Sequence, residues 1–538
     1  MKGNFNRLIV KTALILCAAN IFYPIAAAVA EKALPFDDIS TSYAKNEIID
    51  LYNKKILAGT SPSSFSPARS ITRAEFIAVL NRLLKLEPVE TPINAYADVK
   101  QSAWYYGWVQ AAVQLELAAG KSAAAFAPEK PVTRQEAAVW IARALKQAGN
   151  TPIGSTVFGD GSLIADWASA AAASVYKLGL MKGDNKGNFR PAEPITREET
   201  AVLIDRVLQK DKWVKELDKK PAKKITIGWQ YGQTTGQYIE NLSMSNVNTL
   251  TPRWYFIEKT GAVLDQTDPE LIAWAKKSDK QIWAMVGNRS DQALTHQILT
   301  NSAASNHLID QLAELVSRYG LDGLNIDFEN VAPKDGPALT AFVTQLAERL
   351  DALKAVLSVD VSPDLGTDWT EAFDYAALGK QADYIVMMGY DEHYGGSPKA
   401  GPNASLPYVK HAIDKLLKTV SNAKVILALP FYNRDWTLKP DGAALSSAYL
   451  TIAEQNALVR AYSLKPVWDA ELAQYVVSYT KFAAGHRIWL EEGRSLAAKY
   501  KLVEDKSLAG TAYWYIGGES EEIWAGLRNA EKFYRYNF

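Results

Sequence analysis

The chain has 538 residues, more than one hydrophobic core usually organises, so we expect two to four domains. Basic and acidic side chains balance, 59 against 59, which excludes the broad positive field that attracts nucleic acid. Aromatic residues are frequent, with 15 Trp and 26 Tyr, which suits a protein that stacks on sugars, although cores also use them.

The first 30 residues have the pattern of a secretory signal peptide. Three basic residues precede an apolar run that ends in small residues, which predicts cleavage after Ala30. A membrane anchor is the alternative, and the small residues at the end of the run count against it. The only cysteine, Cys17, lies in this segment, so the mature chain would contain no disulfide. We expect no membrane span in the mature chain.

Three copies of one pattern fill the first half of the chain. In each copy a threonine is followed by arginine and, three residues after the threonine, by glutamate, the spacing of a helix-starting capping box. An earlier helical pattern in each copy ends near a glycine, which we expect to adopt the left-handed conformation that stops a helix. The threonines are Thr72, Thr133 and Thr196, and the glycines are Gly59, Gly120 and Gly183.

This in-phase Thr-Arg-x-Glu pattern resembles the S-layer homology domain. The three copies span residues 31–93, 94–150 and 154–210. The resemblance implies all-α helix-loop-helix units that dock non-covalently to an anionic secondary cell wall polymer. Guanidinium groups bind carboxylates with two hydrogen bonds, so the arginines of the pattern are candidates to bind this polymer. Pairing with glutamates on their own helices is the alternative. These arginines are Arg73, Arg134 and Arg197.

A charged stretch, 211–222, reads as a short linker to the second half. From 223 to 538, apolar strand-like runs alternate with helical patterns, which predicts a parallel sheet closed into a (β/α)8 barrel. The gap after the seventh run is too long for one helix, so we predict an α+β insertion near 435–492. The eight runs lie at 225–229, 247–256, 281–286, 321–330, 356–361, 384–388, 425–429 and 510–515.

The fourth run carries alternating polar and apolar side chains. Asn325, Asp327 and Glu329 occupy odd positions, so a strand would place all three on one face. An edge strand with a solvated polar face is the alternative. The bulky apolar residues between them and Gly323 favour an interior strand instead. We therefore predict a catalytic strand with Glu329 at its mouth.

Residues at the carboxyl ends of the strands form the active site of such a barrel. They combine carboxylates with aromatic rings, a set that suits hydrolysis and stacking of a sugar chain. The chain has only five His and no paired-His spacing, so we expect neither a metal nor another cofactor. The strand-end residues are Asp327, Glu329, Tyr390, Asp391, Tyr432 and Trp514.

Residues 322–329 resemble the DGxDxDxE signature of glycoside hydrolase family 18. Residues 388–391 resemble its MxYD motif. Residues 510–514 resemble its last strand, whose Trp ring forms the bottom of the sugar-binding site. Residues 430–436 and 487–492 look most like the branch that includes bacterial spore-cortex and cell-wall glucosaminidases. Together these matches cover nearly all of residues 223–538.

The resemblance implies retaining catalysis assisted by the substrate. Glu329 would be the general acid, and the substrate's own 2-acetamido oxygen would attack C1. Asp327 and Tyr390 would hold the acetamide, and Trp514 would stack under the sugar. Packing at the barrel rim is the alternative role for Tyr390 and Trp514. The remaining residues that we place in the substrate site are Asn325, Met388, Asp391 and Tyr432.

One position departs from the family pattern. The family usually has Asp where this chain has Asn325. Asn cannot ionise, so Asp327 would feel less like-charge repulsion and titrate more independently. We therefore expect a slower enzyme or a shifted pH optimum.

These patterns predict a secreted enzyme bound to the bacterial cell wall or S-layer that cleaves β-linked N-acetylglucosamine glycans. Peptidoglycan is the preferred substrate, because wall anchoring keeps it at high local concentration. Chitin is the alternative within the same class. A non-catalytic, lectin-like wall protein is the alternative from another class. Intact Glu329 and Asp327 count against it, and Asn325 counts mildly for it.

Overall fold

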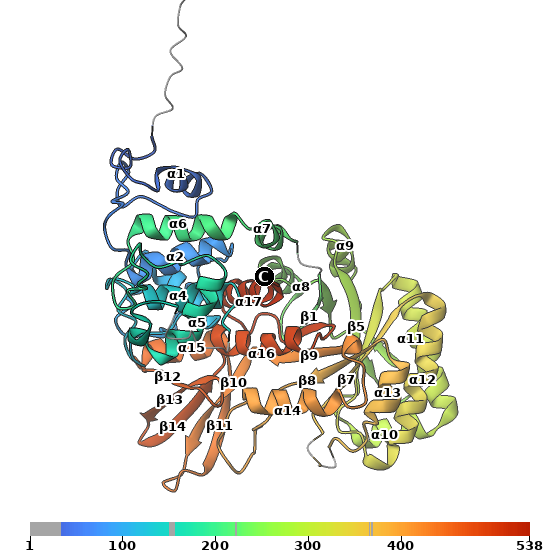
Figure 1. Ribbon diagram of the computed structural model, residues 1–538. Helices are drawn as coiled ribbons and strands as arrows, with labels where there is room; N and C mark the ends of the chain where they lie inside the picture. The colour runs from blue at the N-terminus through green and yellow to red at the C-terminus, as the bar shows by residue number, and fades with distance from the viewer. Residues whose placement is uncertain (1–33, 150–156, 221–222, 365, 367–368) are drawn as a thin grey trace, which may run out of the picture.

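A computed structural model describes residues 34–149, 157–220, 223–364, 366 and 369–538. The predicted signal peptide, with Cys17 and the cleavage site, lies outside these residues. The described chain forms a helical region, drawn in blue to green, beside a larger region of strands and helices, drawn in green to red (Figure 1). Within the described ranges, no helix is long and apolar enough to cross a bilayer.

The helical region contains the three predicted repeats. In each repeat a threonine caps the start of the second helix. Its side chain accepts a hydrogen bond from the N–H of the glutamate three residues later, and the side chain of that glutamate accepts a hydrogen bond from the threonine N–H. The predicted capping boxes and the all-α character are therefore confirmed. The helices are α1 (Lys45–Asn53), α2 (Arg73–Leu83), α3 (Tyr106–Gln114), α4 (Arg134–Ala144), α5 (Asp166–Lys177) and α6 (Arg197–Leu208), with a 3-10 turn at Gly161–Leu163.

The helix stops differ from the prediction. Of the three glycines expected in the left-handed conformation, Gly183 has a positive φ, of 82°, while Gly59 and Gly120 do not. A Cβ on Gly59 would lie 2.5 Å from Phe36 Cε1, and one on Gly120 would lie 2.5 Å from Tyr96 Cε1. These two glycines therefore let an aromatic ring approach the backbone. The left-handed residues just after the first helix of each repeat are Lys55, Glu116 and Gly179.

The three arginines of the repeated pattern join the repeats in a ring. Each is buried, with 1%, 6% and 3% exposed for Arg73, Arg134 and Arg197. Each arginine donates from Nε to a backbone carbonyl of another repeat and forms an ion pair with the capping-box glutamate of that repeat. The alternative, pairing with a glutamate on the same helix, was therefore wrong. Binding of a wall polymer by these arginines stays a prediction. The carbonyls are those of Phe126, Phe189 and Phe65, and the glutamates are Glu136, Glu199 and Glu75.

The segment predicted as a linker is structured over most of its length. Helix α7 (Asp211–Asp218) buries Trp213 and Leu217 in the core of the repeats. The C-terminal helix α17 (Glu522–Arg535) also packs on the repeats, and Arg528 binds the Glu87 carboxylate with three bonds of 2.8–3.1 Å. Apolar residues of the second half, including Phe533, complete the same core. The repeats and the second half are therefore docked on each other.

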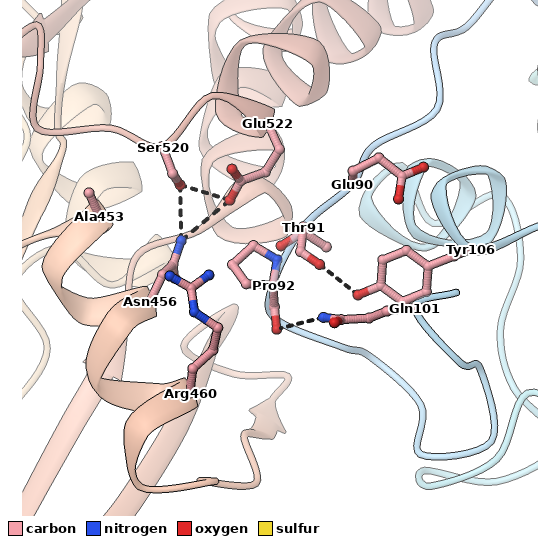
Figure 2. Close-up of a pocket in the computed structure, with 10 residues that line it drawn as sticks. All are labelled: Glu90, Thr91, Pro92, Gln101, Tyr106, Ala453, Asn456, Arg460, Ser520 and Glu522. Carbon is pink, nitrogen blue, oxygen red and sulfur yellow. Dashed lines mark hydrogen bonds between the residues drawn. The ribbon is translucent and has the colours of Figure 1, made fainter. Parts of the chain in front are cut away.

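A polar cleft of about 340 Å³ opens along this junction. Figure 2 shows Thr91, Pro92 and Tyr106 of the repeats on one side, facing residues of the second half on the other. On that second side, Asn456 donates to Ser520 at 2.9 Å and to Glu522 at 3.3 Å. On the first, Tyr106 donates to the carbonyl of Thr91 at 2.6 Å.

The second half is a closed parallel barrel, as predicted. In the described part of the chain, eight strands follow the order β2-β1-β15-β9-β8-β7-β6-β5, and β2 pairs with β5 to close the ring. The strands are β1 (Ile225–Trp229), β2 (Thr249–Thr251), β5 (Gln281–Gly287), β6 (Gly323–Asp327), β7 (Val356–Val361), β8 (Tyr384–Met388), β9 (Val425–Pro430) and β15 (Gly510–Trp514).

The second predicted run, 247–256, is interrupted. It forms β2 and then a separate strand, β3 (Tyr255–Ile257), which pairs with β5 and with an unpredicted antiparallel strand, β4 (Val263–Asp265). Pro252 lies between β2 and β3, and a proline has no N–H to continue a ladder.

Helices cover the outside of the barrel. Leu324, Ile326 and Phe328 point to this layer, and Phe328 stacks on Phe342 with ring centres 5.5 Å apart. The helices are α8 (Thr235–Met244), α9 (Pro269–Lys277), α10 (Gln292–Thr300), α11 (Ser302–Tyr319), α12 (Gly336–Leu353), α13 (Tyr375–Gln381), α14 (Leu406–Leu416) and α16 (Gly493–Asp505), with 3-10 turns at Pro333–Asp335 and Asn422–Lys424.

The insertion follows β9 and is an α+β unit, as predicted. In the described range 432–490 it forms an antiparallel sheet in the order β11-β10-β14-β13-β12 with one helix. It begins at Tyr432, directly after the carboxyl end of β9, so it rises beside the mouth of the barrel. Its elements are β10 (Tyr432–Leu438), β11 (Ala444–Thr451), α15 (Ile452–Ala461), β12 (Val467–Asp469), β13 (Gln474–Lys481) and β14 (Ala484–Leu490).

Candidate active site

Strand β6 carries Asn325 and Asp327, and the predicted general acid Glu329 follows two residues after the strand ends. The strand pairs with β5 on one side and β7 on the other, so it is an interior strand and the edge-strand alternative is wrong. Asn325 is fully buried, whereas Asp327 and Glu329 are partly exposed toward the end of the strand. The period-two alternation therefore brings the two carboxylates to the mouth of the barrel.

Glu329 is held from two directions by the loop after β5. The Ser290 hydroxyl donates to Glu329 Oε2 at 2.8 Å. Asn288 donates from Nδ2 to the Glu329 carbonyl at 2.7 Å and accepts the Glu329 N–H at 3.1 Å. Asn330 donates from Nδ2 to the Ser290 carbonyl at 3.0 Å, which fixes the loop in turn. Neither Asn288 nor Ser290 was predicted from the sequence.

A cleft of about 610 Å³ opens beside Glu329. Of the predicted site residues, Met388, Tyr390 and Asp391 line it together with Glu329. Trp369 and Tyr394, which were not predicted, also line it, and their rings are 43% and 56% exposed. Exposed aromatic rings of this kind provide surfaces on which a sugar can stack.

Tyr390 and Tyr432 are buried side chains near the ends of β8 and β9, and they border Asp391. Tyr432 donates its hydroxyl to Asp391 Oδ1 at 2.7 Å, and its ring lies 6.0 Å from that of Tyr390. Burial raises the pKa of Tyr390 well above its usual value, so its phenol stays protonated and can donate a hydrogen bond. Burial also raises the pKa of Asp391, against the opposing effect of the Tyr432 hydroxyl.

Trp514 ends strand β15 and lies outside the lining of this cleft. Its ring centre is 5.9 Å from that of Trp229 and 5.4 Å from that of Tyr231, which is half exposed. The peptide bond between Trp514 and Tyr515 is cis. Trp514 therefore belongs to a group of rings at the ends of β1 and β15.

Asn325 lies at the centre of a buried polar network below the carboxylates. Its Oδ1 accepts the Trp229 indole N–H at 3.1 Å, and its Nδ2 donates to Asp360 Oδ1 at 2.7 Å and to Ser358 Oγ at 3.0 Å. Asp360, on the neighbouring strand β7, is only 2% exposed. With its polar atoms bonded to the protein, Asn325 supports the site from within. This placement corrects the prediction that Asn325 contacts substrate.

Asp327 has an acidic neighbour despite the Asn at 325. Burial, together with the negative charge of Asp327, raises the pKa of Asp360 well above its usual value. Burial and then the charge of Glu329 raise the pKa of Asp327 to about 8, while Arg253 opposes the shift. Asp327 therefore keeps an acidic neighbour on β7, and the expectation that it titrates more independently stays a prediction.

Comparison with known families matches this geometry. Residues 225–519 match the family described as glycosyl hydrolases family 18, which is more than half of the chain. The chain belongs to glycoside hydrolase family 18. Residues 35–77, 95–138 and 157–201 match the S-layer homology domain. Both predicted resemblances are confirmed.

Relatives with glycosylase or cortex-lytic names match a large share of the chain. An "uncharacterized glycosylase YvbX" of Bacillus subtilis is 28% identical over 57% of this chain and 92% of its own length. A "cortical fragment-lytic enzyme" of Bacillus subtilis is 24% identical over 50% of this chain, and the match spans 64% of that relative. The structure of a Bacillus megaterium spore cortex-lytic enzyme shares the fold, with a TM-score of 0.52 and 22% identity, over 58% of this chain and 75% of that one.

This family 18 site contains no evident place for a metal ion. Across the residues that the structure describes, no group of three or more His, Cys, Asp or Glu side chains is arranged to hold one.

The site residues that the sequence analysis did not predict share one property. Asn288, Ser290, Asp360 and Trp369 come from the ends of other strands or from loops, and no local spacing links them to β6.

Proposed function

We propose that this family 18 enzyme hydrolyses β-linked N-acetylglucosamine glycans, with peptidoglycan as the preferred substrate. The observation that carries the proposal is the placement of the Glu329 carboxylate, which Ser290 holds at 2.8 Å beside a cleft lined with aromatic rings. Asp327 is the last residue of β6, and Glu329 follows it by two residues. A single acid with an adjacent carboxyl group suits a reaction in which the substrate supplies the nucleophile.

In the proposed reaction, Glu329 protonates the glycosidic oxygen as the bond from C1 breaks. The 2-acetamido oxygen of the same sugar attacks C1 and forms a cyclic oxazolinium ion. Glu329, now ionised, then removes a proton from water, which attacks C1, breaks the bond from C1 to the acetamide oxygen and restores the original anomeric configuration. No protein carboxylate forms a bond to the sugar.

Asp327 and Tyr390 orient the acetamide in this proposal. The raised pKa of Asp327 keeps a proton on that carboxyl group in the empty cleft at neutral pH. The positive charge of the oxazolinium ion favours the ionised form, so Asp327 releases its proton to water in the cleft as the charge develops. Tyr390, which keeps its proton, donates a hydrogen bond to the acetamide oxygen. Trp514 supports the sugar from the β15 side.

The S-layer homology repeats bind the secreted enzyme to the cell wall through a secondary wall polymer. The docked junction between the repeats and the barrel supports a protein in which the repeats bind the wall and the barrel carries the active site. Helix α7 and helix α17 hold the barrel against the repeats, so wall binding would also fix where the active site faces.

Incubation of the chain without residues 1–30 with denuded peptidoglycan and with chitooligosaccharides tests the activity. We expect new N-acetylglucosamine reducing ends from peptidoglycan with retained configuration by NMR, and no product from Glu329→Gln. The matched control is Glu314→Gln, an exposed change on α11 that should leave product formation intact. Equal product from Glu329→Gln and the unsubstituted chain would end the catalytic assignment.

The remaining outcomes separate the alternatives. Product from chitooligosaccharides alone would identify a chitinase. Glycan binding without product from any substrate would identify a lectin-like protein. If the chain stayed in the supernatant when purified cell walls were sedimented, the anchoring proposal would fall.

A further inference from the structure

Two arginines lie at the mouth of the barrel around one aromatic ring. Arg253 follows β2, and its guanidinium carbon is 5.3 Å from the centre of the Phe256 ring. Arg289 follows β5 and lies 4.7 Å from the same ring. Arg253 is also 5.0 Å from the ring of Tyr231 and 5.8 Å from that of Trp514. The pair therefore borders the group of rings that contains Trp514.

Neither arginine has an acidic partner within 4.0 Å in the part of the chain that the structure describes. The Nε–H of Arg253 is buried and donates no hydrogen bond there. The buried arginines of the repeats differ, because each of those pairs with a glutamate. The partly buried Arg253 has lost part of its hydration, which the surrounding rings replace only in part, and an anionic ligand would supply the missing charged partner.

Charge is distributed unequally around the cleft. On the β8 side, Asp391 and Glu392 line the wall together with Glu329. On the side of β2 and β5, outside the lining of this cleft, Arg253 and Arg289 lie beside the ring of Phe256. A ligand carboxylate is repelled by the first side and attracted by the second.

The arginine pair is also close to the catalytic acid. Arg289 directly precedes Ser290, whose hydroxyl binds the Glu329 carboxylate. The positive charge of Arg253 reaches Asp327 and opposes the rise in its pKa. A group bound by this pair would therefore belong to a sugar at, or directly beside, the position that is cleaved.

We propose that Arg253 and Arg289 form a binding site for the carboxylate of a sugar that neighbours the cleaved N-acetylglucosamine. This inference rests on the proposed function. Chitin is neutral along its length, whereas peptidoglycan alternates N-acetylglucosamine with N-acetylmuramic acid, whose 3-O-lactyl group ends in a carboxylate. A guanidinium group binds a carboxylate with two parallel hydrogen bonds. The pair selects the carboxylated glycan over the neutral one.

The test compares three oligosaccharides of equal length with the full chain lacking residues 1–30. They are alternating N-acetylglucosamine–N-acetylmuramic acid freed of stem peptides, the same compound with its carboxylates converted to methylamides, and the chitooligosaccharide. The measured quantity is the ratio of kcat/KM for the carboxylate to that for the methylamide. This ratio cancels any effect of a substitution on the shared chemistry.

We expect the unsubstituted enzyme to prefer the carboxylate, mainly through KM. Arg253→Gln and Arg289→Gln should each lower the ratio about tenfold, the usual effect of losing one hydrogen bond to a charged group. Added salt should also lower it, because ions screen the attraction. Arg318→Gln, an exposed change on α11, is the matched control and should leave the ratio unchanged.

Equal kcat/KM for carboxylate and methylamide in the unsubstituted enzyme would overturn the inference, as would an unchanged ratio in both variants. Arg289 is exposed, so its variant decides if Arg253→Gln fails to fold. Failure of the proposed function is a separate result, seen as no product from any of the three compounds. In that case calorimetry measures the binding of the carboxylate and the methylamide compounds to Glu329→Gln. Equal affinities would overturn the inference. Tighter binding of the carboxylate compound, lost when Arg289→Gln is added, would support it.

Discussion

Asn325 on β6 donates a 2.7 Å hydrogen bond from Nδ2 to Asp360 Oδ1 on β7. This bond connects two adjacent strands beneath the catalytic carboxylates. It also places a buried carboxyl group next to the amide of Asn325. The ionised Asp327 in turn raises the pKa of this carboxyl group on the neighbouring strand.

Replacement of Asp360 by Asn should change the pH dependence of catalysis. The charge of Asp327 raises the pKa of Asp360, and repulsion between two ionised carboxylates is mutual, so removal of Asp360 should lower the pKa of Asp327. We expect the limb of the kcat–pH profile that Asp327 governs to move to lower pH. Profiles that superimpose for Asp360→Asn and the unsubstituted enzyme would contradict the coupling.

The same substitution should stabilise the protein at neutral pH. The pKa of Asp360 is higher in the folded state than in the unfolded state, so the folded state holds its proton more tightly. Stability is therefore lost as pH rises from the unfolded pKa, about 3.9, toward the folded value. Urea unfolding between pH 4 and 8 should show that the free energy of unfolding falls less steeply with pH for Asp360→Asn than for the unsubstituted protein. An equally steep fall in both would show that Asp360 does not cause the pH dependence.

Asn325→Asp should destabilise the protein rather than restore a better site. The change removes the Nδ2 donor that binds Asp360 and Ser358 and buries a second carboxyl group against the first. We expect a loss of about 1–3 kcal/mol in the free energy of unfolding at neutral pH. The loss should grow with pH, because ionisation of a buried acid favours the unfolded state.

Urea unfolding measures the effect of Asn325→Asp. The matched control is Asn301→Asp, in which the new carboxylate still accepts the backbone N–H groups at the start of α11. Equal stability of Asn325→Asp and the unsubstituted protein would show that the network tolerates a further acid.

Ser290→Ala should lower kcat about tenfold with little change in KM. The hydroxyl holds one oxygen of Glu329, and loss of a hydrogen bond to a charged group is worth about 1.5 kcal/mol. Steady-state kinetics on oligosaccharides measures the split between kcat and KM, with the exposed Ser302→Ala on α11 as the control. A rise in KM at constant kcat would instead place Ser290 in substrate binding.

Arg73→Gln should destabilise the repeats. The guanidinium is 1% exposed, pairs with Glu136 and donates to two carbonyls of the next repeat. Removal of one partner of a buried pair costs about 3–5 kcal/mol. Denaturant unfolding measures this loss, with the exposed Arg349→Gln as the control. Unchanged unfolding together with lost binding to cell walls would assign Arg73 to the polymer instead.

Features that depend on neighbouring residues could be predicted from the sequence. The Thr-to-Glu spacing of the capping boxes closes within one helical turn, and the alternation at Asn325, Asp327 and Glu329 sets which side chains share a strand face. The eight parallel strands followed from regular apolar runs. One local prediction was wrong, because Gly59 and Gly120 accommodate an approaching ring rather than a left-handed turn.

Contacts between distant parts of the chain could not be predicted in this way. Arg73 and Glu136 are separated by 63 positions, and Asn325 and Asp360 by 35. No spacing in the chain encodes these pairs, because packing of whole repeats and the order of strands around the barrel bring them together. Burial then changes the chemistry of Asp327 and Asp360, since the pKa of a carboxyl group depends on everything that excludes water from it. Ten consecutive residues are thus enough to predict the catalytic strand, whereas the protonation of its carboxyl groups and the hydrogen bonds that support them depend on the closed barrel.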